Sequence, residues 1–136
     1  MTHVLRKWLG TLIDEKEAFN LYQKAADLGN SNRINNLGQC HSYSIGTEAD
    51  LGNVYGISSL GDCYYNGIGT YFSKQKAFES YLMAANLDDD YAQYNVANMY
   101  KIGDGVKKDL NLAIYWYNKS AGQGYLVAQN KLYELS

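Results

Sequence analysis

The side chains with the widest chemical range in this sequence are two histidines and two cysteines. His3 and His41 have no second histidine or carboxylate at ligand spacing on the same predicted helix, so a zinc site is not supported. Cys40 directly precedes His41, but adjacent helical residues point about 100° apart and do not form a nucleophile and base. We therefore interpret His41 as a packing residue, and Cys40 and Cys63 as buried thiols.

Glycine pairs and an acidic run are the remaining candidates for ligand chemistry. Gly67-Ile68-Gly69 and Gly103-Asp104-Gly105 follow no predicted strand and lack the rest of a phosphate-binding fingerprint. Asp88-Asp89-Asp90 is interpreted as a solvated turn whose last residue caps the next helix. Asn118-Lys119-Ser120 matches a glycosylation sequon but falls within a predicted helix. The sequence thus predicts no catalytic residue, metal ligand or cofactor, and we expect a protein that is not an enzyme.

The elements that would position a binding surface are helices, which Gly, Asn, Asp and Ser delimit because the chain has no proline. An apolar stripe predicts a helix over 53–66, which the glycines of 67–70 end. Ser73 is a suitable N-cap for a helix over 74–87. The buried face of that helix is predicted to hold Ala77, Phe78, Tyr81, Ala84 and Ala85.

Five further helices follow the same rules. Asp14 and Glu17 resemble a capping box before a helix over 15–28, and residues 31–43 form another helix. Asp90 is expected to cap a helix ending near 102. Asp109 is expected to cap one ending near 121, and a last helix covers 125–135.

The helices recur at fixed steps along the chain. Ala77-Phe78-Glu79-Ser80-Tyr81 returns as Ala113-Ile114-Tyr115-Trp116-Tyr117 after 36 residues, whereas Leu37-Gly38-Gln39-Cys40 returns as Leu60-Gly61-Asp62-Cys63 after only 23. A period in the thirties is typical of helical-hairpin solenoids. The deficit of 13 residues is the length of one helix. We therefore predict an all-α solenoid in which one repeat lacks its second helix.

These strings resemble Sel-1-like repeats, relatives of the tetratricopeptide repeat with a longer period and paired glycines between their helices. The resemblance rests on residues 36–40, 60–70 and 113–121 and extends over about residues 14 to 135. It implies an α/α superhelix that serves as a scaffold or adaptor for protein complexes. Relatives act in endoplasmic-reticulum quality control, in bacterial signalling and, in fungi, beside kinase-like domains. This chain departs from the pattern at the missing helix after residue 50, at its initial half helix, and at His41.

We expect one repeat domain over residues 1–136. Its predicted parts are a partial repeat over 1–29, a truncated repeat over 30–52, full repeats over 53–88 and 89–124, and a terminal helix over 125–136.

The first helices of the repeats carry the candidate partner-binding surface. If Leu60 and Gly61 face the neighbouring helix, residues on the opposite side of the same helix form a concave face. The candidates are Tyr55, Ser58, Asp62 and Tyr65 in one repeat, Tyr91, Tyr94, Asn98 and Lys101 in the next, and Asn130 in the last helix. Tyr and Asn suit recognition of a protein or peptide. Alternatively, the 14 tyrosines of the chain fill half-buried helix positions.

The charges of the chain bear on its kind of partner and on its location in the cell. The net charge is −2, and both signs are scattered along the chain, which argues against nucleic acid and membranes as partners. The charged opening segment does not fit a signal peptide, so we expect a cytoplasmic protein.

Two alternatives stand beside a scaffold. The chain could be a regulatory piece of a larger signalling or quality-control protein, or a degenerate copy without a complete groove. The gap before residue 53 also predicts self-association through residues 31–66, where Ile34, Leu37 and Ile57 would form an exposed apolar patch.

Overall fold

A computed structural model describes residues 15–27 and 43–135 of the chain, and every regular element in these two ranges is an α-helix. The chain forms two compact units, unit 1 (Met1–Phe72) and unit 2 (Ser73–Ser136). The predicted all-α fold is confirmed. Residues 31–42 of the helix predicted over 31–43, the cap at Asp14 and the side chains of His3, Cys40 and His41 lie outside the described residues.

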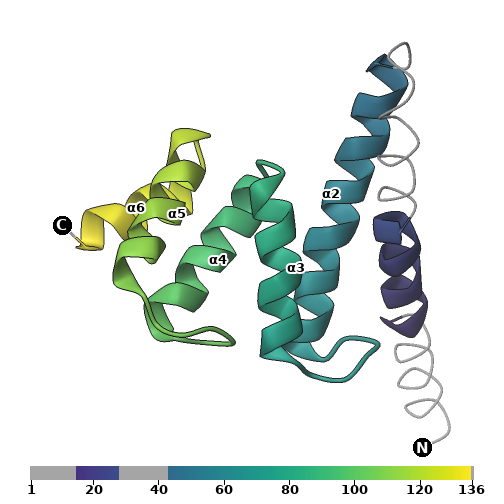
Figure 1. Ribbon diagram of the computed structural model, residues 1–136, viewed down its shortest axis with the longest axis horizontal. Helices are drawn as coiled ribbons and strands as arrows, with labels where there is room; N and C mark the ends of the chain where they lie inside the picture. Colours follow the sequence, from purple (N-terminus) through teal and green to yellow (C-terminus); the bar gives the residue numbers. More distant parts are fainter. Residues whose placement is uncertain (1–14, 28–42, 136) are drawn as a thin grey trace, which may run out of the picture. The chain divides into compact units, whose positions relative to one another are not determined.

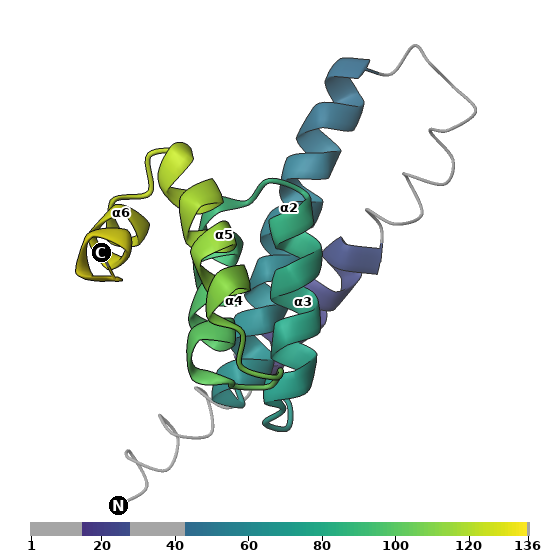
Figure 2. The same ribbon diagram turned by 60° about the vertical axis from the view of Figure 1, so that its left-hand side comes forward.

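In unit 1 the helix over 15–27 packs against α2 (Tyr43–Asn66), as Figures 1 and 2 show. Gly56 permits this approach, since a Cβ built there would lie 2.9 Å from the Cβ of Ala25. Once its amide is oriented to satisfy both neighbours, Asn53 donates to the carbonyl of Ala26 at 2.9 Å. Aromatic contact continues along the pair, where the rings of Phe19 and Tyr64 meet edge to face at 5.6 Å.

Helix α2 is longer than the sequence predicts. The apolar stripe predicts a start at residue 53, but the helix begins ten residues earlier, at Tyr43. Two glycines, Gly46 and Gly52, lie in the added stretch. A glycine costs a helix only about 1 kcal/mol and, unlike proline, keeps its backbone donor, so the hydrogen-bond ladder continues through both positions. Residues 43–52 therefore belong to one long helix with the first helix of the following repeat.

Unit 2 contains four helices, each packed against the next along the chain: α3 (Lys74–Asn86), α4 (Asp90–Ile102), α5 (Leu110–Gly122) and α6 (Leu126–Leu135). Figures 1 and 2 show α3, α4 and α5 side by side. The predicted buried face of α3 is confirmed at all five of its positions. Small residues dominate the remaining core, where Ala92, Ala97, Ala113 and Ala128 are fully buried and let helix backbones approach closely.

Side-chain caps and glycine turns end these helices. Ser73 and Asp109 cap α3 and α5 as predicted, accepting hydrogen bonds from the backbone N–H groups of Lys76 and Leu112 at 3.2 and 3.1 Å. The cap predicted at Asp90 is wrong, because Asp89 accepts the bond from the N–H of Ala92 and Asp90 is already helical. In a run of three aspartates, spacing alone does not distinguish these registers.

The glycine pairs take the conformation that the sequence predicts. Gly67 and Gly69 after α2 have φ of 68° and 70°, and Gly103 and Gly105 after α4 both have 75°. Gly105 also lies against the start of α3, where a built Cβ would be 2.4 Å from the carbonyl oxygen of Lys74. These turns therefore require glycine for both conformation and space.

Candidate functional site

The four candidate residues of unit 1 divide between surface and interior. Tyr55 is 65% exposed, and its ring meets that of Tyr22 edge to face at 6.0 Å. Asp62 and Tyr65 are half-buried. Ser58 is only 5% exposed, and its hydroxyl donates to the backbone carbonyl of Tyr55 at 3.1 Å. A side chain this buried offers no contact area, so we leave Ser58 out of the candidate surface.

The candidates of unit 2 lie on two helices, and we call them the α4–α6 surface: Tyr91, Tyr94, Asn98 and Lys101 of α4, and Asn130 of α6. Tyr91 is 38% exposed, and Asn130 is also exposed. Tyr94, Asn98 and Lys101 are half-buried. The four α4 candidates thus share one helix with part of each side chain accessible, and Asn130 is exposed on α6.

Tyr94 of α4 belongs to a cluster of three tyrosines. Its ring centroid lies 5.9 Å from that of Tyr117 on α5 and 5.3 Å from that of Tyr125, just before α6. Such tilted aromatic pairs add about 0.5–1.5 kcal/mol beyond their buried area. The cluster therefore holds the ring of Tyr94 in place, whereas the ring of Tyr91 contacts Tyr81 of α3.

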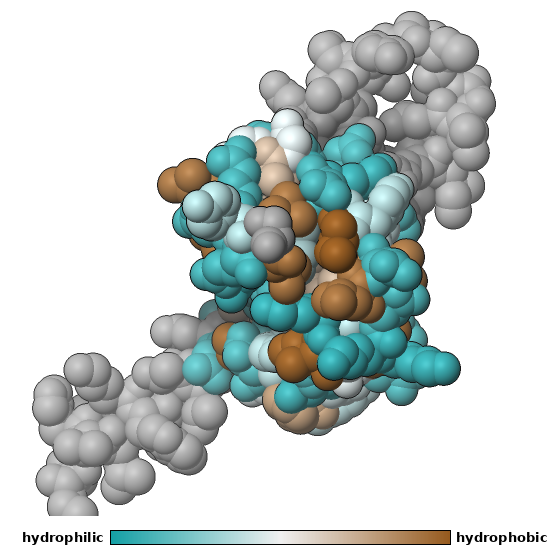
Figure 3. Space-filling view, turned by 90° about the vertical axis from the view of Figure 1, so that its left-hand side faces the viewer, coloured by the Kyte–Doolittle hydropathy of each residue, from teal (hydrophilic) through white to brown (hydrophobic). Residues whose placement is uncertain are grey.

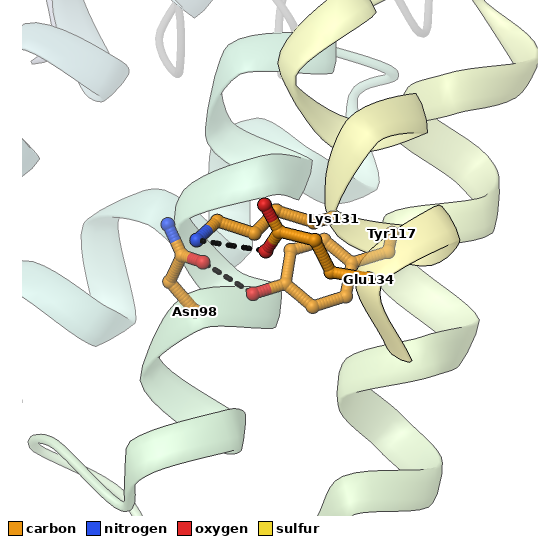
Figure 4. Close-up of polar contacts among 4 residues, drawn as sticks. All are labelled: Asn98, Tyr117, Lys131 and Glu134. Atoms are coloured by element: carbon orange, nitrogen blue, oxygen red, sulfur yellow. Dashed lines mark hydrogen bonds and ion pairs between the residues drawn. The ribbon is translucent and has the colours of Figure 1, made fainter. Parts of the chain in front are cut away.

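Asn98 is held by a buried donor. The Tyr117 hydroxyl donates to its side-chain oxygen, and Figure 4 shows this pair beside Lys131 and Glu134 of α6. Lys131 and Glu134 form their own ion pair at 3.7 Å. Among the described residues the amide nitrogen of Asn98 has no partner. This nitrogen is therefore a fixed donor that a ligand's carbonyl group could accept from.

Burial raises the pKa of two hydroxyls of the cluster, those of Tyr117 and Tyr125. It raises the pKa of Tyr117 to about 12, and the neighbouring Tyr94 and Glu134 add to the effect. Burial also raises the pKa of Tyr125, with further contributions from Tyr94, Asp90 and Asp89. Tyr117 therefore remains a hydrogen-bond donor at neutral pH, and it orients the amide of Asn98.

Two glutamines with a repeated role were not predicted. Gln93 donates to the carbonyl of Ala85 and Gln129 to that of Ala121, both at 3.1 Å. The two pairs are related by the 36-residue step, so each closes the end of a preceding second helix in the same way. The sequence contains both glutamines at the same repeat position. Their hydrogen-bond acceptors, however, are seen only when the neighbouring helix is in place. Gln123 extends the first bond by donating to the side-chain oxygen of Gln93 at 2.9 Å.

The side of unit 2 on which α6 lies carries apolar side chains among hydrophilic ones, as Figure 3 shows. The exposed apolar residues of α6 include Leu126, Val127 and Leu135. In unit 1, by contrast, Ile57 is buried, which removes it from the apolar patch predicted for self-association. Ile34 and Leu37 of that patch lie outside the described residues.

Two observations concern metal and thiol chemistry in the described residues. No group of three or more His, Cys, Asp or Glu side chains among them could hold a metal ion. Cys63 is buried, and this burial raises the pKa of its thiol, as do Asp62 and Glu15, so the thiolate is disfavoured. Over the same part of the chain, none of the helices has the length and apolar character needed to cross a bilayer.

Comparison with known proteins gives one family and several solved structures. The Sel1 repeat model matches the chain at residues 9–30, 34–52, 54–89 and 90–125. A Sel1 repeat protein from Oxalobacter formigenes is 26% identical, with a TM-score of 0.58 over 86% of this chain and 44% of that one. A protective antigen of uropathogenic Escherichia coli with an SLR fold is also 26% identical, with a TM-score of 0.58 over 82% of this chain and 25% of that one.

A third solved structure agrees in fold. Cysteine rich protein B of Helicobacter pylori is 24% identical, with a TM-score of 0.57 over 86% of this chain and 93% of that one. The chain thus spans less than half the length of the first two structures and nearly all of the third. No curated protein matches it.

Proposed function

The chain belongs to the Sel1 repeat family, and from this membership we propose that it is a non-catalytic interaction module whose unit 2 binds a protein or peptide on the α4–α6 surface. In this role it acts as a scaffold or adaptor. Tyr55, Asp62 and Tyr65 of unit 1 are proposed as further contact residues. The proposal includes a cytoplasmic location, which cell fractionation checks.

The observation that carries the proposal is the preset amide of Asn98. A buried tyrosine holds its oxygen, so its nitrogen already points in one direction before a ligand arrives. Binding then requires less loss of side-chain entropy than at a mobile asparagine. Tyr91 and Tyr94 on the same helix offer flat rings for apolar contact, an arrangement that suits a peptide backbone with intervening side chains.

Site-specific photo-crosslinking in cells tests this proposal. A crosslinking amino acid replaces Tyr91 or Asn130 on the proposed surface, or Tyr115 as a matched control. Tyr115 is an exposed tyrosine two residues from Tyr117, so it points to the other side of α5. We expect Tyr91 and Asn130 to give the same crosslinked partner and Tyr115 to give none of it.

Substitution of the preset donor completes the test. Asn98→Ala should reduce the Tyr91 crosslink about tenfold or more, since it removes a hydrogen bond and leaves the Tyr117 hydroxyl without its acceptor. A crosslink of equal yield from Tyr115, or one that persists unchanged with Asn98→Ala, would show that the α4–α6 surface is not the binding site.

A further inference from the structure

Three lysines gather around the turn between α4 and α5, and we call them the lysine turn: Lys101, Lys107 and Lys108. Lys101 is half-buried in the last turn of α4, and the other two are exposed. The turn folds back on α4, since the backbone N–H of Asp109 donates to the carbonyl of Tyr100 at 2.9 Å. Lys108 lies beside the C-cap of α4, where a Cβ built on Gly103 would be 3.1 Å from the Lys108 Cβ.

The carboxylates of this turn are already engaged. Asp104 pairs with the ammonium of Lys74 at 2.8 Å, and Asp109 caps α5 by accepting from the N–H of Leu112 at 3.1 Å. Within the described part of the chain, Lys101, Lys107 and Lys108 form no ion pair. The carboxylate of Asp104 is paired with Lys74, and Asp109 offsets only part of the charge of three lysines, so the turn keeps a net positive charge.

The fold does not require lysine at these positions. Unit 1 has the same turn after α2, with paired glycines at matching positive φ. At the 36-residue step, its equivalents of Lys101, Lys107 and Lys108 are Tyr65, Tyr71 and Phe72. Lysine near a helix C-terminus can stabilise the helix dipole, but α2 ends in this turn with no basic residue. Two turns of one geometry thus carry different side chains, so neither the turn nor the helix end requires these lysines.

The surroundings of the lysines define the class of ligand. Ile102 is 67% exposed and Leu110 is 47% exposed, so cationic and aliphatic groups alternate around the turn. Unit 2 contains no arginine and has Asp88, Asp89 and Asp90 between α3 and α4, which does not resemble the continuous basic stripe of a nucleic-acid site. Three lysines are also few for stable attachment to an anionic membrane.

We propose that the lysine turn binds an acidic peptide segment of the partner, with carboxylates at Lys101, Lys107 and Lys108 and apolar side chains on Ile102 and Leu110. This rests on the proposed function, because Lys101 joins the turn to the α4–α6 surface. The partner segment then runs along α4 from the tyrosines toward the turn and places its acidic end last.

Fluorescence polarisation with a defined probe tests the proposal on the full chain. The probe is a labelled peptide rich in glutamate that also carries leucines, and its control replaces every glutamate by glutamine. The variant Lys107→Gln/Lys108→Gln should weaken binding of the glutamate probe about fivefold to tenfold, as expected for two solvent-accessible ion pairs. The matched variant Lys76→Gln/Lys119→Gln removes the same charge from exposed positions on α3 and α5 and should change binding less than about twofold.

A triple variant tests whether the loss of binding could come from altered folding of the turn. Lys101→Tyr/Lys107→Tyr/Lys108→Phe gives this turn the residues of its counterpart in unit 1, and it should keep the circular dichroism of the parent while losing the preference for glutamate over glutamine. Equal binding of both peptides by the parent would overturn the proposal. So would equal losses in the two double variants, or a stronger lysine-dependent affinity for duplex RNA or phosphatidylserine vesicles than for the probe.

The experiments distinguish a failure of the α4–α6 surface from a failure of the lysine turn. Lysine-dependent binding of the glutamate probe without any crosslink from Tyr91 or Asn130 would contradict the α4–α6 surface alone. A crosslink that depends on Asn98 but not on Lys107 and Lys108, together with no preference for glutamate, would contradict the lysine turn alone.

Discussion

Tyr117 shows how a single residue joins packing to recognition. Its ring is fully buried on α5 and contacts Tyr94, while its hydroxyl donates to Asn98 on α4. The same side chain therefore contributes to the core and orients the amide proposed to meet the partner. Replacement by a residue of the same shape separates the two roles.

Tyr117→Phe is expected to lower the free energy of unfolding at neutral pH by about 1 kcal/mol, because one hydrogen bond is lost. It should also change the pH dependence. The folded pKa of about 12 lies above the ordinary tyrosine value of 10.0, so the contribution of this hydroxyl is complete below pH 10 and is lost as pH rises toward 12. The parent should lose about 2 kcal/mol of stability over this interval that the variant does not lose. Urea titrations at several pH values measure this difference in the free energy of unfolding, and Tyr115→Phe is the control at an exposed tyrosine. If the parent and Tyr117→Phe had the same pH dependence of stability, the raised pKa of Tyr117 would be contradicted.

Asp88 is the only non-glycine residue with positive φ, 68°, in the described part of the chain. It ends α3, where the N–H groups of Asp88 and Asp89 donate to the carbonyls of Ala85 and Ala84. Glycine adopts this conformation without a Cβ clash, so Asp88→Gly should raise the unfolding free energy by about 1 kcal/mol. Asn86→Gly, at the last residue of the same helix, should lower it by about 0.3 kcal/mol, the difference in helix propensity between the two residues. Thermal denaturation of both variants checks the opposite signs, and a shift in the same direction would refute the argument.

At the scale of elements, each glycine turn connects two helices and also contacts a third. In unit 1, a Cβ built on Gly69 would be 2.2 Å from the carbonyl oxygen of Glu15, and in unit 2 Gly105 makes the equivalent approach to Lys74. The paired glycines that end a first helix therefore also set how closely the turn approaches the start of the preceding second helix. The glycines that recur with the 36-residue repeat are thus also the residues that allow this close approach.

Gly105→Ala is expected to cost about 2 kcal/mol or more, because it combines a positive φ with overlap against backbone that has little freedom to move. The matched control is Gly122→Ala in α5, where a built Cβ meets nothing within 4 Å. That variant should be neutral or stabilising by up to about 1 kcal/mol. Chemical denaturation distinguishes the two, and equal effects would show that turn contacts do not limit stability.

At the scale of the whole molecule, stability should follow the number of neighbours of each helix. In unit 2, α4 packs against both α3 and α5, whereas α6 packs mainly against α5. Stacked repeats gain stability chiefly from nearest-neighbour interfaces. We expect native-state hydrogen exchange to be slowest in α4 and fastest in α6. Uniform protection across the four helices would instead indicate one cooperative unit.

The sequence by itself determined the features that depend on local chemistry. These are the helical ranges of unit 2, the N-caps Ser73 and Asp109, and the glycine turns, because capping and positive φ involve residues only a few positions apart. The repeat also predicted that successive helices pack against each other, as α3 to α6 do within unit 2. It did not decide where α2 begins, because glycine weakens a helix without ending it.

Only the tertiary structure decided the roles of residues of the same type. Tyr115 and Tyr117 are two positions apart, yet one is exposed and the other is buried against Asn98. Ser58 is buried, and Gln93 and Gln129 bind carbonyls of the preceding helix. Burial and hydrogen bonding at these positions depend on which neighbouring helix faces each side chain, and periodicity within one helix contains no such information.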